Sequence, residues 1–195
     1  MKLHDFLQKI ISKPALFEKQ TDGPRDLNSC LIDENIYFNR FHGATADAIS
    51  HYTEYILPQN DPTDLTIGCG TNDILQMCRN DATQDPQKVV DSILTIARKG
   101  KARGVKNINI ESIPIIRGRR HELLRNIINL RIKEACVPEG YFFIDNTNIT
   151  LWYLNEDGIH LNPSGNFKIK LNLLKTCESF NPFLCDFYNF CDNEY

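Results

Sequence analysis

The chain has 195 residues, 42% hydrophobic and 24% charged, which fits one α/β domain with short extensions better than two domains or a disordered chain. The formal net charge of −3 gives no general attraction to nucleic acid or to anionic membranes. No apolar run is long enough to cross a bilayer, so a membrane protein is not expected.

The sequence also predicts a cytoplasmic location and no metal. Charged residues interrupt the first 19 positions, which therefore lack the apolar core of a signal peptide. The seven cysteines are odd in number and widely scattered, as expected for reduced intracellular thiols. No two of them have CxxC spacing, so neither a zinc site nor any other cofactor is predicted.

The N-terminal part of the chain predicts two helices and one strand. Apolar residues at spacings of three and four indicate a helix over residues 3–11, and the polar, turn-rich stretch 20–28 indicates a loop. Residues 36–38 are a short β-prone run that closes at Arg40. A helical pattern follows over residues 44–57.

Strands and helices then alternate. Strands are predicted at 65–67, 105–110 and 141–144, and helices at 86–103, 119–135 and from Pro163, with Asn162 as N-cap. This order predicts βαβ units, a mainly parallel sheet and helices on both faces. Ligands of such sheets bind beyond the carboxyl ends of the strands.

Three motifs fall at those strand ends. Gly43, in Phe41-His42-Gly43-Ala44-Thr45, can bring its N–H close to a ligand, or it can simply form a tight turn. Asn72, in Gly70-Thr71-Asn72-Asp73, can donate to a developing oxyanion, and Asp73 can cap the next helix or hold the loop in shape. The alternative for this motif is an ordinary Gly-Asn turn.

The third motif is Asp157-Gly158-Ile159-His160, followed by Leu161-Asn162-Pro163-Ser164-Gly165. Asp157 and His160 are three residues apart in a turn, so the carboxylate can orient the imidazole and stabilise the imidazolium formed when His160 takes a proton. The alternative is an exposed loop with an unrelated histidine.

Taken together and in this order, the three motifs resemble the SGNH (GDSL-like) hydrolase family over about residues 35–175. The resemblance implies a three-layer α/β/α, flavodoxin-like fold with a five-stranded parallel sheet, and cleavage of a small-molecule ester or acylated substrate by serine chemistry. It also implies roles for four residues: His160 as general base, Asp157 as its orienting partner, and Gly43 and Asn72 as oxyanion donors. The overall sequence pattern is similar to that of SGNH-type domains encoded in animal retrotransposons.

One block of that family is missing. Its Gly-Asp-Ser sequence, which carries the nucleophile at the end of a central strand, does not occur in this chain. Ser12 has roughly the right spacing from Gly43, but Ile10-Ile11-Ser12-Lys13-Pro14 resembles a helix end. The expected organisation is therefore a replaced first block (residues 1–28), an SGNH-like domain (29–176) and a C-terminal tail (177–195), with strands beside the missing one left as open edges.

Three functions stay open at this point. The chain can be a serine esterase with Ser12 as an unusual nucleophile, or a binding module that kept the scaffold without the chemistry. The basic cluster Arg117-Gly118-Arg119-Arg120-His121 allows a third, an accessory protein that contacts nucleic acid, although a solvated helix start explains that cluster more simply.

Overall fold

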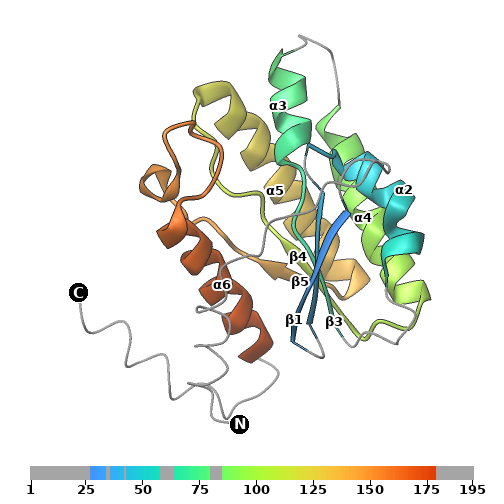
Figure 1. The fold of residues 1–195 in the computed structure, drawn as a ribbon. Coiled ribbons are helices and arrows are strands. Elements are labelled where there is room, and N and C mark those ends of the chain that lie inside the picture. Colours follow the sequence, from blue (N-terminus) through green and yellow to red (C-terminus); the bar gives the residue numbers. More distant parts are fainter. Residues whose placement is uncertain (1–26, 34–35, 42, 58–63, 80–84, 179–195) are drawn as a thin grey trace. The chain divides into compact units, whose positions relative to one another are not determined.

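The computed structural model describes residues 27–33, 36–41, 43–57, 64–79 and 85–178 (Figure 1). The chain divides into two compact units, residues 1–44 and 45–195. The helix predicted at residues 3–11, Ser12 and nearly all of the predicted tail lie outside the described residues.

The first unit contains an antiparallel pair of strands, β1 (Leu27–Asp33) and β2 (Ile36–Phe41). β2 confirms the strand predicted at 36–38, but β1 was not predicted, and its first residues, Leu27 and Asn28, were assigned to a loop. Asn, Ser and Asp are depleted in strands, so β1 carries a weak signal of its own and depends on pairing with β2. The five parallel strands implied by the resemblance are therefore not reproduced in the described residues.

The second unit is built on a parallel sheet of three strands in the order β3-β4-β5. These are β3 (Asp64–Ile67), β4 (Asn107–Glu111) and β5 (Phe142–Ile144), all close to the predicted strands. Among the described residues β3 pairs with β4 alone. Because the three strands are parallel, their carboxyl ends lie at one edge of the sheet.

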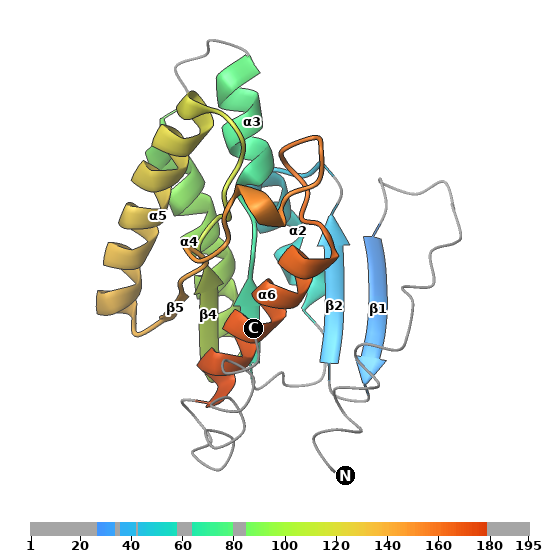
Figure 2. The same ribbon diagram turned by 90° about the vertical axis from the view of Figure 1, so that its left-hand side faces the viewer.

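Helices cover both faces of this sheet, which confirms the predicted α/β class. α2 (Ala46–Ile56), α4 (Pro86–Ala102) and α5 (Arg119–Glu139) pack together on one side, and α6 (Pro163–Glu178) lies on the other (Figures 1 and 2). The short helices α3 (Thr71–Arg79) and η1 (Leu151–Tyr153) follow β3 and β5. None of the helices described is both long and apolar enough to span a membrane.

The layer of α2, α4 and α5 meets the sheet through a continuous apolar core. Isoleucines dominate it, among them Ile93, Ile108, Ile110, Ile128 and Ile132, each at most 3% exposed. A Cβ at Gly100 of α4 would lie 2.6 Å from Leu65 Cδ2, so the absence of a side chain there lets α4 approach β3 closely.

Two polar pairs join β3 to β4 between residues that lie opposite each other in the register. Asn107 Nδ2 donates to Asp64 Oδ1 at 2.8 Å, and Asn109 Nδ2 donates to Thr66 Oγ1 at 3.4 Å. Because side chains alternate along a strand, Asn107, Asn109 and Glu111 share one face, while Ile108 and Ile110 turn to the other.

Local capping explains where the helices begin and end. As predicted, Asn162 caps α6, accepting from the Gly165 N–H at 2.9 Å, and Pro86 begins α4 behind Asp85. α5 continues past the predicted end at Ala135 to Glu139, where Gly140 adopts a left-handed conformation. Pro138 is accommodated in this last turn because it removes only one backbone donor.

Candidate active site

The turns that follow β3, β4 and β5 form the carboxyl edge of the sheet, and they carry most of the residues singled out in the sequence. The turn after β3 leads through Gly70 and Thr71 into α3. The long segment after β5 carries η1 and then Asp157 and His160, before α6 begins (Figure 2). This is the edge at which open α/β sheets bind ligands.

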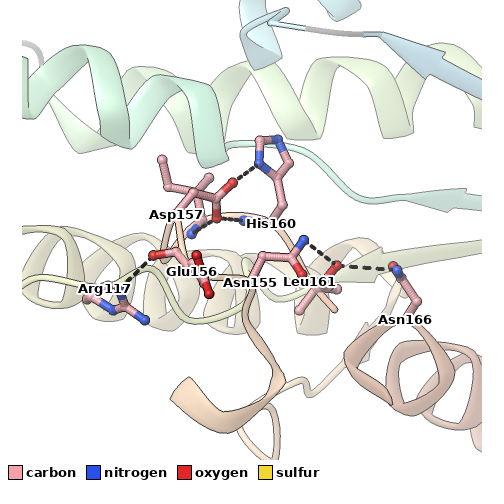
Figure 3. Close-up of polar contacts among 8 residues, drawn as sticks. Arg117, Asn155, Glu156, Asp157, His160, Leu161 and Asn166 are labelled. Carbon is pink, nitrogen blue, oxygen red and sulfur yellow. Dashed lines mark hydrogen bonds and ion pairs between the residues drawn. The ribbon is translucent and has the colours of Figure 1, made fainter. Parts of the chain in front are cut away.

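Asp157 and His160 form a hydrogen-bonded pair, as their spacing predicted. Asp157 Oδ2 lies 2.6 Å from His160 Nδ1, and Asp157 Oδ1 accepts from the backbone N–H groups of Ile159 (2.8 Å) and His160 (2.9 Å) (Figure 3). The hydrogen bond from the His160 ring, aided by these two backbone donors, lowers the pKa of Asp157 from 3.8 to about 2.

The ionised state of Asp157 fixes the tautomer of its partner. A carboxylate only accepts hydrogen bonds, so Nδ1 of His160 must carry the proton in the short contact. In neutral His160 the lone pair then lies on Nε2, which makes no hydrogen bond to any residue in the described segments. His160 is thus prepared to accept a proton at Nε2, the arrangement that a general base requires.

The loop that carries this pair is closed on itself. The N–H of Asn155 donates to the His160 carbonyl at 2.7 Å, the N–H of Gly158 donates to the Asn155 carbonyl at 3.0 Å, and Leu154 and Leu161 form an isolated antiparallel bridge. Asn155 Nδ2 also reaches the Leu161 carbonyl at 3.4 Å. These bonds hold the backbone of the exposed His160 in place.

Arg117 braces the same loop from the turn before α5. Its N–H donates to the Gly158 carbonyl at 2.8 Å, and its Nη1 donates to the Glu156 carbonyl at 2.9 Å (Figure 3). Arg117 belongs to the basic cluster of residues 117–121, and this role was not predicted because its partners are backbone carbonyls that leave no signal in the sequence. Arg120 of that cluster likewise donates to the Cys78 carbonyl, at 3.5 Å.

Asn72 occupies the first turn of α3, directly after the sheet edge. The turn before it depends on Gly70, which has φ +112° and whose Cβ, if present, would lie 2.5 Å from Ile113 Cδ1. Asn72 is half-buried at this position. The structure therefore brings Asn72 to the same edge as the Asp157–His160 loop, and its role as an oxyanion donor stays a prediction.

Asp73 acts on a different helix from the one expected. It lies inside α3 and is 7% exposed, and its Oδ2 accepts from the Ala46 N–H, at the beginning of α2, at 2.9 Å. Burial raises the pKa of Asp73, and the hydrogen bonds from the backbone of Ala46 and of Asp73 itself oppose that shift. The predicted cap of the next helix is therefore wrong, and Asp73 instead accepts from the first N–H of α2.

Gly43 and Ser12 are the remaining predicted site residues. Gly43 belongs to the first unit, is exposed and has φ +70°, which fits both a tight turn and an oxyanion donor. Ser12 lies outside the described residues.

Cys69 lies in the turn after β3 and carries a thiol, but its surroundings keep that thiol protonated and unreactive as a nucleophile. Burial, and to a smaller extent the charges of Asp73 and Glu111, raise the pKa of the Cys69 thiol to about 12. The thiolate is the reactive form of cysteine, so Cys69 is not a nucleophile at neutral pH. The described part of the chain also holds no cluster of side chains suited to a metal ion.

No family model matches the chain, and no curated protein matches it. Solved structures do. The chain is similar to a GDSL-like lipase from Bacteroides thetaiotaomicron, with 18% identity, a TM-score of 0.58 and coverage of 70% of this chain and 72% of the other.

Two further structures give the same result. A putative acylhydrolase from Bacteroides fragilis has 16% identity and a TM-score of 0.59, over 71% of this chain and 72% of the other. The acetyl xylan esterase AlAXEase has 15% identity and a TM-score of 0.60, over 69% of this chain and 76% of the other. The chain therefore has the α/β fold seen in GDSL-like lipases, acylhydrolases and acetyl xylan esterases.

Proposed function

We propose that the chain is an SGNH-type hydrolase domain that cleaves a small-molecule ester or acylated substrate. The observation that carries this proposal is the 2.6 Å contact between Asp157 Oδ2 and His160 Nδ1, at the sheet edge where this fold binds ligands. The fold supports it by analogy, since the similar structures are named as a lipase, an acylhydrolase and an esterase.

In the proposed reaction, Nε2 of His160 takes the proton of a serine hydroxyl as its oxygen attacks the ester carbonyl carbon. Asn72 and the N–H of Gly43 donate to the resulting oxyanion. The protonated His160 gives its proton to the leaving alcohol, which leaves an acyl-enzyme. Water, deprotonated by His160, then releases the acid and restores the serine. Asp157 stabilises the imidazolium in both halves of the reaction.

Ser12 is the proposed nucleophile, because Gly-Asp-Ser is missing and Ser12 has roughly the family's spacing from Gly43. The same proposal includes the absence of the Gly-Asp-Ser block from this sequence and a relation to SGNH-type domains encoded in retrotransposons.

Labelling with a fluorophosphonate probe tests the proposal directly. The full chain is treated with the probe, and the adduct is located by mass spectrometry in the wild-type protein and in His160→Ala. We expect an adduct on Ser12 that is lost in His160→Ala. An adduct that persists without His160 would contradict the assigned base, and an adduct on another serine would move the nucleophile there.

A second candidate is a binding module that kept this scaffold without its chemistry. The observation that favours it is the absence of Gly-Asp-Ser from the sequence. A protein that is folded by circular dichroism, takes up no probe and hydrolyses no short-chain ester would support this second function over the first.

A further inference from the structure

A cavity of about 160 Å³ lies at the carboxyl ends of β3 and β4. The β3 turn lines it with Gly68, Cys69 and Thr71, and the end of β4 lines it with Glu111, Ser112 and Ile113. A single water molecule needs about 10–15 Å³ of such space, so the cavity has room for a small chemical group.

Glu111 supplies the charge of this cavity and is held from two sides. A Cβ at Gly68 on the neighbouring strand would lie 3.1 Å from Glu111 Oε2, so the glycine leaves the space in which the carboxyl sits. On the other side, the side chain of Asn146, after β5, interacts with the carboxyl and favours its charged form. The space for the carboxyl is thus provided by the backbone of β3, with a polar neighbour beside it.

No basic side chain in the described segments forms an ion pair with Glu111. The titratable neighbours on the β3–α3 side are Cys69 and Asp73, and α6 reaches the cavity with Ile169. The thiol of Cys69 stays neutral, because its pKa is raised to about 12. A partly buried carboxylate without a counter-charge is costly, and a cation in the cavity would remove that cost.

We infer that this cavity is a subsite for a positively charged ammonium group of the substrate, with Glu111 as its counter-charge. That the ligand is a substrate rests on the proposed function, whereas binding of an ammonium ion in the cavity does not. Packing alone does not explain a carboxyl here, because a glutamine would fill the same space without the desolvation cost.

The subsite has a pH signature. Burial raises the pKa of Glu111 from 4.5 to about 7, against the opposite effect of the Asn146 side chain. A proton and an ammonium ion therefore compete for the same carboxyl near neutral pH. With a pKa of about 7, the ionised fraction changes about tenfold between pH 6 and pH 8, and the affinity for the ammonium ion should change by the same factor.

Titration of the isotope-labelled full chain with ethylammonium chloride, followed by NMR, tests the subsite. We expect saturable shifts of the Gly68, Cys69 and Ser112 amides near pH 8, with about tenfold weaker binding near pH 6. Glu111→Gln should abolish the shifts, and Gly68→Ala should weaken binding by crowding the carboxyl. Glu134→Gln, on the exposed face of α5, is the matched control and should bind as the wild type does.

Three outcomes would overturn the subsite: no saturable shift, equal binding to Glu111→Gln, or shifts confined to other parts of the chain. Hydrolysis of acetylcholine and of its neutral isostere 3,3-dimethylbutyl acetate separates this result from the proposed function. If the subsite exists, Glu111→Gln raises KM for the charged ester alone. Ammonium binding without hydrolysis of either ester would remove the proposed function and leave the subsite standing.

Discussion

Asp73, on α3, accepts a hydrogen bond from the backbone N–H of Ala46, at the beginning of α2, at 2.9 Å. The two residues are 27 positions apart in the sequence, and the contact is buried. The Gly70-Thr71-Asn72-Asp73 motif thus has two separate tasks. Asn72 lies at the sheet edge, where chemistry is proposed, while Asp73 fixes the helix that precedes β3.

Substitutions at Asp73 should separate its acceptor from its charge. Asp73→Ala leaves a buried N–H of Ala46 without its acceptor, and we expect the free energy of unfolding to fall by about 1–3 kcal/mol. Asp73→Asn keeps an acceptor oxygen and removes the buried charge, so its free energy of unfolding should fall much less. Urea denaturation of both variants measures the difference, and equal losses would contradict this account.

The stability of Asp73→Asn should also differ from that of the wild-type protein in its dependence on pH. Burial raises the folded-state pKa of Asp73 above 3.8, so the folded state binds this proton more tightly than the unfolded state does. Stability supplied by the protonated carboxyl is therefore lost as the pH rises from about 4 through the folded-state pKa. We expect Asp73→Asn to gain stability relative to the wild type over that interval, measured by urea denaturation at each pH.

Asp157 should show the opposite sign. Its pKa is lowered from 3.8 to about 2, so its contribution to stability is present above pH 3.8 and is lost as the pH falls toward 2. Asp157→Asn lacks this contribution, so its melting temperature should lie below that of the wild type above about pH 4 and approach it near pH 2, with a small difference because the side chain is exposed. Thermal denaturation between about pH 2 and pH 5 measures both effects.

The same variant should impair catalysis if the proposed reaction is correct. An asparagine can hold the wrong tautomer of His160, and in a comparable triad such a change lowers kcat by about 10⁴. The measurement is the hydrolysis of a short-chain ester by the folded variant. Full activity of Asp157→Asn would show that the carboxylate does not orient the base.

Gly158 should be intolerant of a side chain. It has φ +70°, and a Cβ would lie 2.6 Å from Arg117 Cβ. Gly158→Ala therefore strains the backbone and also pushes the loop away from Arg117, which holds it through two hydrogen bonds. Gly104→Ala is the control, because Gly104 has φ +88° with no atom within 4 Å of the added Cβ. We expect Gly104→Ala to cost about 1–2 kcal/mol and Gly158→Ala distinctly more, measured by urea denaturation.

Asn72→Ala should lower turnover with little effect on stability. Removing one donor to a developing oxyanion costs about 10²–10³ in kcat. Steady-state hydrolysis of a short-chain ester measures this change, and a melting curve provides the control for folding. Unchanged turnover in a folded Asn72→Ala protein would remove Asn72 from the proposed oxyanion site.

The sequence predicted the second unit well because its signals are local. Apolar spacing located α4 and α5, and Asn162-Pro163 marked the beginning of α6 correctly. The approach of Asp157 to His160 was predictable for the same reason, since three residues in a turn determine it.

What the sequence could not predict depends on partners distant in the chain. β1 forms against β2 despite its Asn, Ser and Asp residues, and Arg117 contacts backbone carbonyls about 40 positions away. Glu111 lies one residue beyond the strand predicted at 105–110 and was not singled out, because its burial and its nearness to Gly68 arise only when β3 and β4 pair. Such contacts leave no periodic pattern in one sequence.

The polar pairs between β3 and β4 bear on which sheet this sequence can form. If β4 slipped by one residue, Asn107 and Asn109 would enter the apolar layer beneath α4, and Ile108 and Ile110 would turn to the opposite face. Asn107 would then lose its carboxylate partner Asp64, and Asn109 would lose the Thr66 hydroxyl. These asparagines thus destabilise sheets with the wrong register more than they stabilise the native sheet. The register that they favour places Gly68 beside Glu111.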